Sequence, residues 1–251
     1  MAIKTRKISD WLSANGQAIT NASKATMEDA IRADIGQLYD GVFIMFHRKS
    51  DDFPLAVRVS SWASYQASGE IAEGVLLVEG GRHLVIAPTE ASSAKWSSKP
   101  VSSSDTSGSV QISGVTTTGD RIIALTDFAG RSNTTAIING STSSNVTNTE
   151  EYAAGFCNRY SRTNANGRGL TAGKWWLPSI GEMAMIWANF DKINYALSKI
   201  SGATQLQANW YWTSTQASAP NAWSLFLNAG TMLANSKFNQ NRVRPVSAFL
   251  N

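Results

Sequence analysis

The sequence contains a single cysteine, Cys157, and only two histidines, His47 and His83. One cysteine excludes a disulfide framework, and also a cysteine-based zinc site, within one chain. Neither histidine has a second histidine or a carboxylate cluster at the spacing that a metal site requires. We therefore expect neither a bound metal nor a cofactor.

Charged residues are also scarce, at 16% of the chain, and the net charge is only +4. Lysines and arginines are scattered, whereas a nucleic-acid-binding protein usually shows a basic stripe. We therefore expect no nucleic-acid partner.

No apolar run reaches the length of a membrane span, so we expect no membrane insertion. The first 24 residues lack the apolar core of a secretory signal peptide. We expect synthesis in the cytoplasm, followed by release through a route such as lysis if the protein works outside the cell. The alternatives are that it stays cytoplasmic or leaves by another route that does not use the Sec pathway.

Hydrophobic side chains, in contrast, are plentiful, at 43% of the residues, and nine of them are tryptophans. A chain of 251 residues with this composition can bury a large core, either as one domain or as a main domain with a smaller one. Tryptophan is common both in cores and on binding surfaces, so its number fits both uses.

The order of expected elements indicates an α+β fold with a mainly antiparallel sheet. Residues 121–140 fit either a helix or a strand followed by a loop. Elsewhere the patterns predict a helix at 23–41, strands at 41–50 and 53–62, a hairpin at 74–92 that turns at Gly80 and Gly81, a long Ser/Thr/Gly-rich loop at 92–119, helices at 147–162 and 180–200, and strands from 209 and from 221. The clearest helix start is Ser179 with Glu182, the pattern of a capping box.

No set of residues suggests catalysis. The stretch 167–174, GRGLTAGK, resembles a phosphate-binding loop, but Arg168 stands where that motif needs glycine and Trp175 where it needs serine or threonine. Cys157 lies on the apolar face of an expected helix, which favours an inert buried thiol. We therefore expect that the protein is not an enzyme.

The C-terminal part begins regularly and then loses its pattern. Trp223, Leu225 and Leu227 alternate with polar or small residues and Phe226, as in a half-buried strand. Residues 229–240 mix small, amide and aromatic side chains without periodicity. A regular pattern returns at 242–246, where Arg242 and Arg244 alternate with valine, so we expect both on the solvent side of a strand, paired with carboxylates or carbonyls.

Four motifs follow one another in this part of the chain: GKWWLPSIGEM at 173–183, YWTST at 211–215, AW at 222–223 and RVRPVSAF at 242–249. Together they resemble the C-type-lectin-like domains of variable proteins from diversity-generating retroelements, in the phage and gut-bacterial branch. The resemblance covers about residues 70–251. It implies a C-type-lectin-like domain of the formylglycine-generating-enzyme-like subclass at 70–251, with a variable region at about 209–246. Residues 1–69 would form a small helix and strand region for packing or oligomerisation.

The resemblance also implies an origin for the irregular segment. In such systems a reverse transcriptase misreads template adenines, and asparagine codons are the usual targets. Misreading the first two bases of an asparagine codon can give many residues but never Trp, Met, Gln, Lys or Glu. Ser224, Phe226, Ala229, Thr231, Leu233, Ala234, Ser236 and Phe238 can arise in this way. Trp212, Trp223, Met232 and Lys237 cannot, and they stand where inward-facing residues are plausible; Gln240 cannot either.

These observations predict an exposed ligand-binding surface, held in place by a set of buried side chains. The side chains expected to be buried are Trp176, Trp212, Trp223, Leu225 and Val243. The side chains expected to converge on one exposed face are Tyr211, Ser224, Phe226, Asn228, Ala229, Thr231, Ala234, Ser236, Phe238 and Gln240, with Phe226 and Phe238 as apolar anchors.

The resemblance implies a receptor-binding protein of a phage tail that serves host adhesion. Its expected partners are a host-cell surface protein or glycan and other tail proteins, and a homotrimer is the expected assembly. The alternatives are a structural tail or fibre component, or an enzyme related to formylglycine-generating enzymes. Catalysis in those enzymes depends on cysteines, and the lone Cys157 on a helix face does not support it.

Overall fold

The computed structural model describes residues 39–98, 111–143 and 145–249. The chain divides into two compact units, Met1–Tyr39 and Asp40–Asn251. The helix expected from residue 23 falls on residues outside the described part, and the role in packing or oligomerisation proposed for that region stays a prediction.

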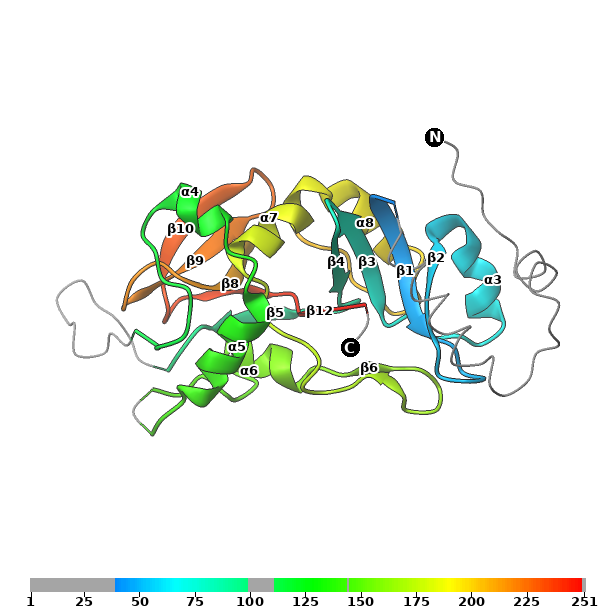
Figure 1. Ribbon diagram of the computed structural model, residues 1–251, viewed down its shortest axis with the longest axis horizontal. Coiled ribbons are helices and arrows are strands. Elements are labelled where there is room, and N and C mark those ends of the chain that lie inside the picture. The colour runs from blue at the N-terminus through cyan, green and yellow to red at the C-terminus, as the bar shows by residue number, and fades with distance from the viewer. Residues whose placement is uncertain (1–38, 99–110, 144, 250–251) are drawn as a thin grey trace, which may run out of the picture. The chain divides into compact units, whose positions relative to one another are not determined.

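One antiparallel sheet is built mostly from the first strands of the second unit (Figure 1). Its strands, in spatial order, are β12 (Val246–Ser247), β4 (Arg82–Ile86), β3 (Gly74–Glu79), β1 (Gly41–His47) and β2 (Pro54–Arg58). β1 pairs with β3, so residues 41–58 share a sheet with residues beyond 70. The compact unit therefore begins at residue 40 and not at the expected boundary of 69 and 70.

The hairpin expected at 74–92 is present as β3 and β4. Gly80 and Gly81 have φ values of 55° and 77°, the positive values that a two-residue type I′ turn requires and that glycine adopts without strain. The apolar runs on both sides of this turn are buried on both faces of the sheet.

The second sheet is built mostly from the C-terminal part of the chain. Its order is β10 (Thr231–Ser236), β9 (Asn221–Phe226), β8 (Trp210–Gln216), β11 (Gln240–Val243) and β5 (Ala91–Lys95). β8 and β11 run parallel, and the other neighbours are antiparallel. β5 lies where a loop was expected from residue 92. It is a strand because it pairs with β11 and because Ala94 is buried among apolar side chains. A separate pair of short strands, β6 (Arg162–Thr163) and β7 (Gly169–Leu170), completes the strands described.

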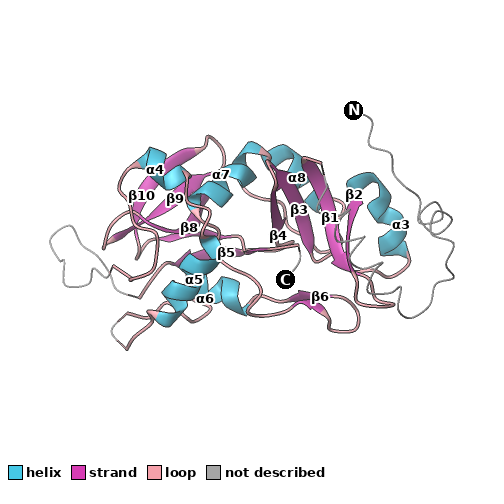
Figure 2. Ribbon diagram, in the orientation of Figure 1, coloured by secondary structure: helices cyan, strands magenta, loops and turns pink. Residues whose placement is uncertain are grey.

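The helices in the described part of the chain are short (Figure 2). They are the 3-10 turn η1 (Val59–Ser61), α3 (Trp62–Ala67), α4 (Arg121–Leu125), α5 (Gly130–Asn139), α6 (Ala153–Arg159), α7 (Ile180–Ala188) and α8 (Phe190–Leu197). The undecided segment 121–140 thus forms two helices, α4 and α5. Asp120 accepts hydrogen bonds from the backbone N–H groups of Ile122 and Ile123 and fixes the start of α4. The capping box predicted at Ser179 and Glu182 is confirmed at the start of α7.

Two clusters of apolar side chains hold the unit together. In the larger one, α8 packs on β1 and β3, and α7 packs on β8 and β9. In the smaller one, α5 and α6 cover the opposite face of the second sheet. The predicted burial of Trp176, Trp212, Trp223, Leu225 and Val243 is confirmed, since each is at most 6% exposed. The α+β class is confirmed as well.

Candidate functional site

Strand β9 lies between β10 and β8, in the part of the sheet that carries the predicted ligand-binding residues. Trp223 and Leu225 point from one face of β9 into the larger core cluster. On the same face, Leu225 lies between Met232 of β10 and Tyr211 of β8, which are its cross-strand partners. Trp212 points to the other face, where it packs in the smaller cluster and donates its indole N–H to the Ala94 carbonyl at 2.9 Å.

Two residues of the predicted ligand-binding set are buried, so their expected exposure is wrong. Ser224 lies on the face opposite Trp223, as its alternation predicts, but this face is also covered, and Ser224 is fully buried beside its partner Trp212. Tyr211 faces Leu225, and its hydroxyl donates to Glu90 at 2.7 Å. Burial and the nearby Glu90 carboxylate raise the pKa of Tyr211.

Residues 228–239, which we call the display segment, show a different pattern. They form the turn after β9, strand β10 at the sheet edge, and the turn that leads to β11. Within this segment Met232 and Lys237 are buried, and every other residue is exposed or half-buried. The predicted residues Asn228, Ala229, Thr231, Ala234 and Phe238 are exposed, Ser236 is half-buried, and Gln240, just beyond the segment, is exposed.

The exposed residues do not all face the same way. Thr231 pairs with Phe226, so the two share the sheet face that also carries Trp210. Ala234 pairs with Trp223, and therefore faces the other side. Because side chains alternate along a strand, a set that includes positions of both parities in β10 cannot converge on one face. The expected single face is thus divided between the two sides of the edge strand.

Two aromatic contacts mark the outer part of this surface. The rings of Trp210 and Phe226 lie 5.1 Å apart between centroids, and both side chains are half-buried. Phe238 is 38% exposed, and the ammonium group of Lys95 lies 4.2 Å from the centre of its ring. Gln240 accepts a hydrogen bond from the Ser93 hydroxyl at 2.7 Å, which ties the end of the segment to β5.

Lys237 lies in the turn between β10 and β11, with its side chain directed into the protein. It is only 2% exposed. Its ammonium group lies 4.4 Å from the centre of the Trp96 ring and 2.5 Å from Oε1 of Gln216. Burial lowers the pKa of Lys237 to about 7. Its carbonyl accepts from the backbone N–H groups of Trp96 and Ser97, at 2.9 and 3.1 Å.

The two arginines that follow the segment are structural. Arg242 and Arg244 both pair with Glu90, at 2.7 and 2.8 Å. Arg244 is fully buried and also donates to the carbonyl oxygens of Ala87 and Thr204. The pairing with a carboxylate and carbonyls is as expected, but the expected solvent side is wrong for Arg244, because the chain folds it beneath residues 87–90.

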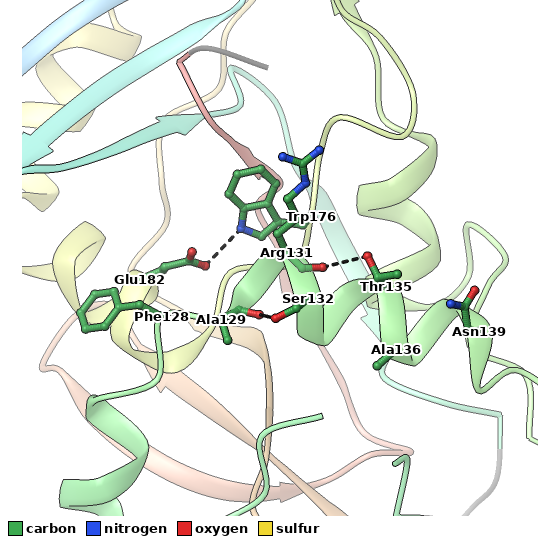
Figure 3. A pocket seen from close by; sticks show the side chains of 9 residues that line it. All are labelled: Phe128, Ala129, Arg131, Ser132, Thr135, Ala136, Asn139, Trp176 and Glu182. Atoms are coloured by element: carbon green, nitrogen blue, oxygen red, sulfur yellow. Dashed lines mark hydrogen bonds between the residues drawn. The ribbon is translucent and has the colours of Figure 1, made fainter. Parts of the chain in front are cut away.

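A separate pocket of about 660 Å³ lies between α5 and the start of α7 (Figure 3). Trp176, Glu182 and one side of α5 line it. From the sequence, the capping-box pattern singles out Glu182, but only as a residue that starts a helix. The pocket itself was not predicted, because the α5 residues that complete it come from segment 121–140, whose structure the sequence left undecided.

The remaining features that the sequence raised are the cysteine, a metal site and a membrane span. Cys157 is fully buried, as expected, and burial raises the pKa of its thiol. Among the described residues, no cluster of histidine, cysteine and carboxylate side chains could hold a metal ion. In the same part of the chain no helix is both long enough and apolar enough to cross a membrane.

No protein-family model and no curated protein matches this chain. Among solved structures it is similar to a fimbrial protein from Bacteroides ovatus ATCC 8483, with 20% sequence identity and a TM-score of 0.42. The similarity covers 66% of this chain and 36% of the other, so this chain spans little more than a third of that protein's length.

Proposed function

We propose that this chain is a ligand-binding protein with a C-type-lectin-like domain, whose display segment is diversified by a retroelement. We further propose that it is a receptor-binding protein of a phage tail, that its ligand is a host-cell surface protein or glycan, and that it is not an enzyme. Contacts with other tail proteins, and a homotrimeric assembly, belong to the same proposal.

One observation supports the proposal: in the display segment, the buried residues are those that cannot arise from an asparagine codon, and the exposed ones are those that can. The buried residues are Met232 and Lys237, and neither can arise from an asparagine codon. Every exposed or half-buried residue in the segment is either asparagine or a residue that can arise from its codon. Outside the segment the rule fails for Ser224, which can arise from an asparagine codon and is buried, and for Gln240, which cannot and is exposed.

Physical constraints explain why such a pattern suits a binding surface. Changing a buried side chain by even one methylene group costs stability, whereas most exposed positions accept substitution at little cost. A surface that must vary from copy to copy therefore needs its fixed residues inside and its changeable residues outside. Serine, glycine and asparagine, which antibody binding loops also use, are among the residues outside.

The gene itself provides the test. If misread asparagine codons produced the segment, the codons of Ala229, Thr231, Leu233 and Ala234 must each end in C or T, because the third base is unchanged. A near-copy of the end of the gene, lying beside a reverse-transcriptase gene, must carry asparagine codons at these positions.

Trp223 is the internal control, because its codon TGG contains no adenine and must be identical in both copies. Met232 and Lys237 have codons with adenines, so the same comparison shows whether these buried positions are spared. A codon such as CTG at Leu233, or a genome without the near-copy, would refute diversification and favour a structural tail or fibre component.

A further inference from the structure

Strand β10 is the last strand on one side of the second sheet, so only one of its two edges is paired. Its register with β9 is regular over the whole strand. The next residue, Lys237, donates its backbone N–H to the Pro220 carbonyl at 3.1 Å and continues this register. Because bonded and non-bonded pairs alternate along an antiparallel ladder, Met232, Ala234 and Ser236 direct their backbone groups away from β9.

The outward backbone groups of β10 are accessible. Among the described residues, β10 pairs with no strand other than β9, and no hydrogen bond outside the sheet ladders involves the backbone of Met232 or Ala234. The side chains around these groups are open to solvent: Leu233 is 41% exposed, and Thr231 and Ala234 are exposed as well. A further strand therefore finds both donors and acceptors along this edge.

The other outer strands of the two five-stranded sheets are protected. β12 has only two residues, and Val246 exchanges backbone hydrogen bonds with Trp176 at 2.8 and 3.0 Å. β5 ends at Lys95, whose N–H donates to the Glu151 carbonyl at 3.2 Å. β2 begins with Pro54, which has no N–H to donate. Short length, charge, proline and cover by another segment are the usual means of keeping a sheet edge from pairing with another chain.

The edge of β10 has none of these protections. The strand is six residues long and contains neither proline nor a charged side chain. Throughout the display segment the one charged residue is Lys237, whose side chain is buried. An edge that is long, regular and uncharged is a ready template for another strand, so its exposure indicates a partner.

We propose that the ligand of the display segment is a protein, and that it binds by adding an extended, uncharged segment to the outer edge of β10. This inference rests on the proposed function, in which the display segment is the binding surface. N–H and C=O groups recur along the edge at the spacing that another peptide strand matches, whereas the hydroxyl groups of a glycan do not share this repeat. A partner segment without charge suits an edge that offers no charged group to pair with it.

Edge pairing also accounts for two features of the display segment. Backbone hydrogen bonds are the same for every residue except proline, so the affinity they provide persists when the side chains change. The changeable side chains lie on both faces of β10, and an added strand carries its own side chains on both faces in the same alternation. On one face the partner meets Leu233, and on the other it meets the small Ala234.

The test selects short random peptides, displayed on phage, for binding to the immobilised full chain, and we expect uncharged peptides rich in strand-forming residues. Ala234→Pro removes an outward N–H, and proline is tolerated in an edge strand where the N–H faces solvent, so this variant should fold. It should weaken binding of a selected peptide about tenfold, because a main-chain hydrogen bond is lost. Ala234→Val is the matched control: it adds a side chain of similar size but keeps the N–H, and should bind as the original chain does.

A second measurement uses the peptide and needs no variant of the protein. N-methylation of alternate residues blocks one edge of a selected peptide at a time. One of the two methylated forms should lose binding and the other should keep it, since only one edge of the peptide faces β10. This result decides the matter even if thermal unfolding shows that Ala234→Pro disrupts the hairpin.

Side-chain variants separate this inference from the proposed function. Leu233→Ser and Phe238→Ser change exposed side chains and keep every backbone group. If they weaken binding of a peptide, or of a glycan on an array, while Ala234→Pro and N-methylation have no effect, edge pairing is wrong and the display segment binds through its side chains alone. If none of these changes affects binding, both the edge pairing and the binding role of the display segment are wrong.

Two further outcomes would overturn edge pairing by a ligand. One is a selection that yields no peptide. The other is a dimer of the chain, seen by sedimentation, that Ala234→Pro dissociates and Ala234→Val does not, because the edge of β10 would then belong to a second copy of this chain.

Discussion

Lys237 carries an amine into the interior beneath the exposed turn between β10 and β11. Burial lowers its pKa to about 7 from 10.5. Between these values the unfolded chain holds a proton that the folded chain has lost, so the free energy of unfolding rises with pH in this range. Below about pH 7 both states are protonated, and the cost of burying the charge is fully present.

Replacing Lys237 with methionine should therefore remove a pH dependence. Methionine is unbranched and only one heavy atom shorter than lysine, and Oε1 of Gln216 retains its hydrogen bond from the Ile112 N–H at 3.1 Å. The stability of the original chain relative to Lys237→Met should increase between pH 7 and pH 10 by up to about 1.4 kcal/mol per pH unit.

Urea unfolding at several pH values measures this difference. Lys199→Met serves as the control, because Lys199 is exposed and its replacement should leave the pH profile unchanged. Parallel profiles for Lys237→Met and the original chain would mean that Lys237 keeps its ordinary pKa.

At the scale of elements, the turn from β9 to β10 depends on Gly230. Its φ of 68° lies in the region that favours glycine, and a Cβ atom there would come within 2.6 Å of the Trp187 ring. Gly202 gives a matched comparison, since its φ is 74° but nothing lies within 4 Å of an added Cβ.

We expect Gly202→Ala to cost about 1 kcal/mol, for backbone strain alone. Gly230→Ala should cost about 1–3 kcal/mol more, because the Trp187 ring must also move. Thermal or urea unfolding of both variants decides the matter. Equal losses would show that Trp187 yields freely and that only the backbone requires glycine at residue 230.

The elements also show what local sequence could predict. The capping box at Ser179, the Gly80–Gly81 turn and the alternation around Trp223 are local signals, and each element they predict is present. β5 and β10 carry no such signal, because neither strand alternates large apolar with polar side chains. They are strands because neighbouring strands from distant parts of the chain satisfy their backbone hydrogen bonds.

For the candidate site, too, the sequence predicts the local features and misses those that depend on contacts between distant parts of the chain. The alternation in β9 gives the correct parity for Ser224, but parity cannot show that helices on both sides cover the sheet. Tyr211 lies in the larger apolar cluster, and its hydroxyl donates to Glu90, which is far from it in sequence. The pocket at Glu182 needs the first turn of α5 to approach the start of α7, and no local pattern predicts that contact.

At the scale of the whole molecule, the division between fixed and changeable positions can be measured without knowing the ligand. A library with the codon NNC at Ala229, Thr231, Leu233, Ala234, Ser236 and Phe238 changes only exposed or half-buried side chains. Most of its members should fold, because exposed substitutions rarely cost more than about 0.5 kcal/mol each.

A matched library places the same codon at Tyr211, Ala222, Ser224, Leu225, Leu227 and Met232, which are all buried in the two clusters or beside them. Here most members should fail to fold, since large-to-small and polar changes in a core cost about 2–5 kcal/mol each. Display of both libraries, protease treatment and sequencing of the survivors give the folded fraction of each. Similar survival in the two libraries would mean that the display segment is no more tolerant than the core. In that case a surface built to vary would be the wrong account of this part of the chain.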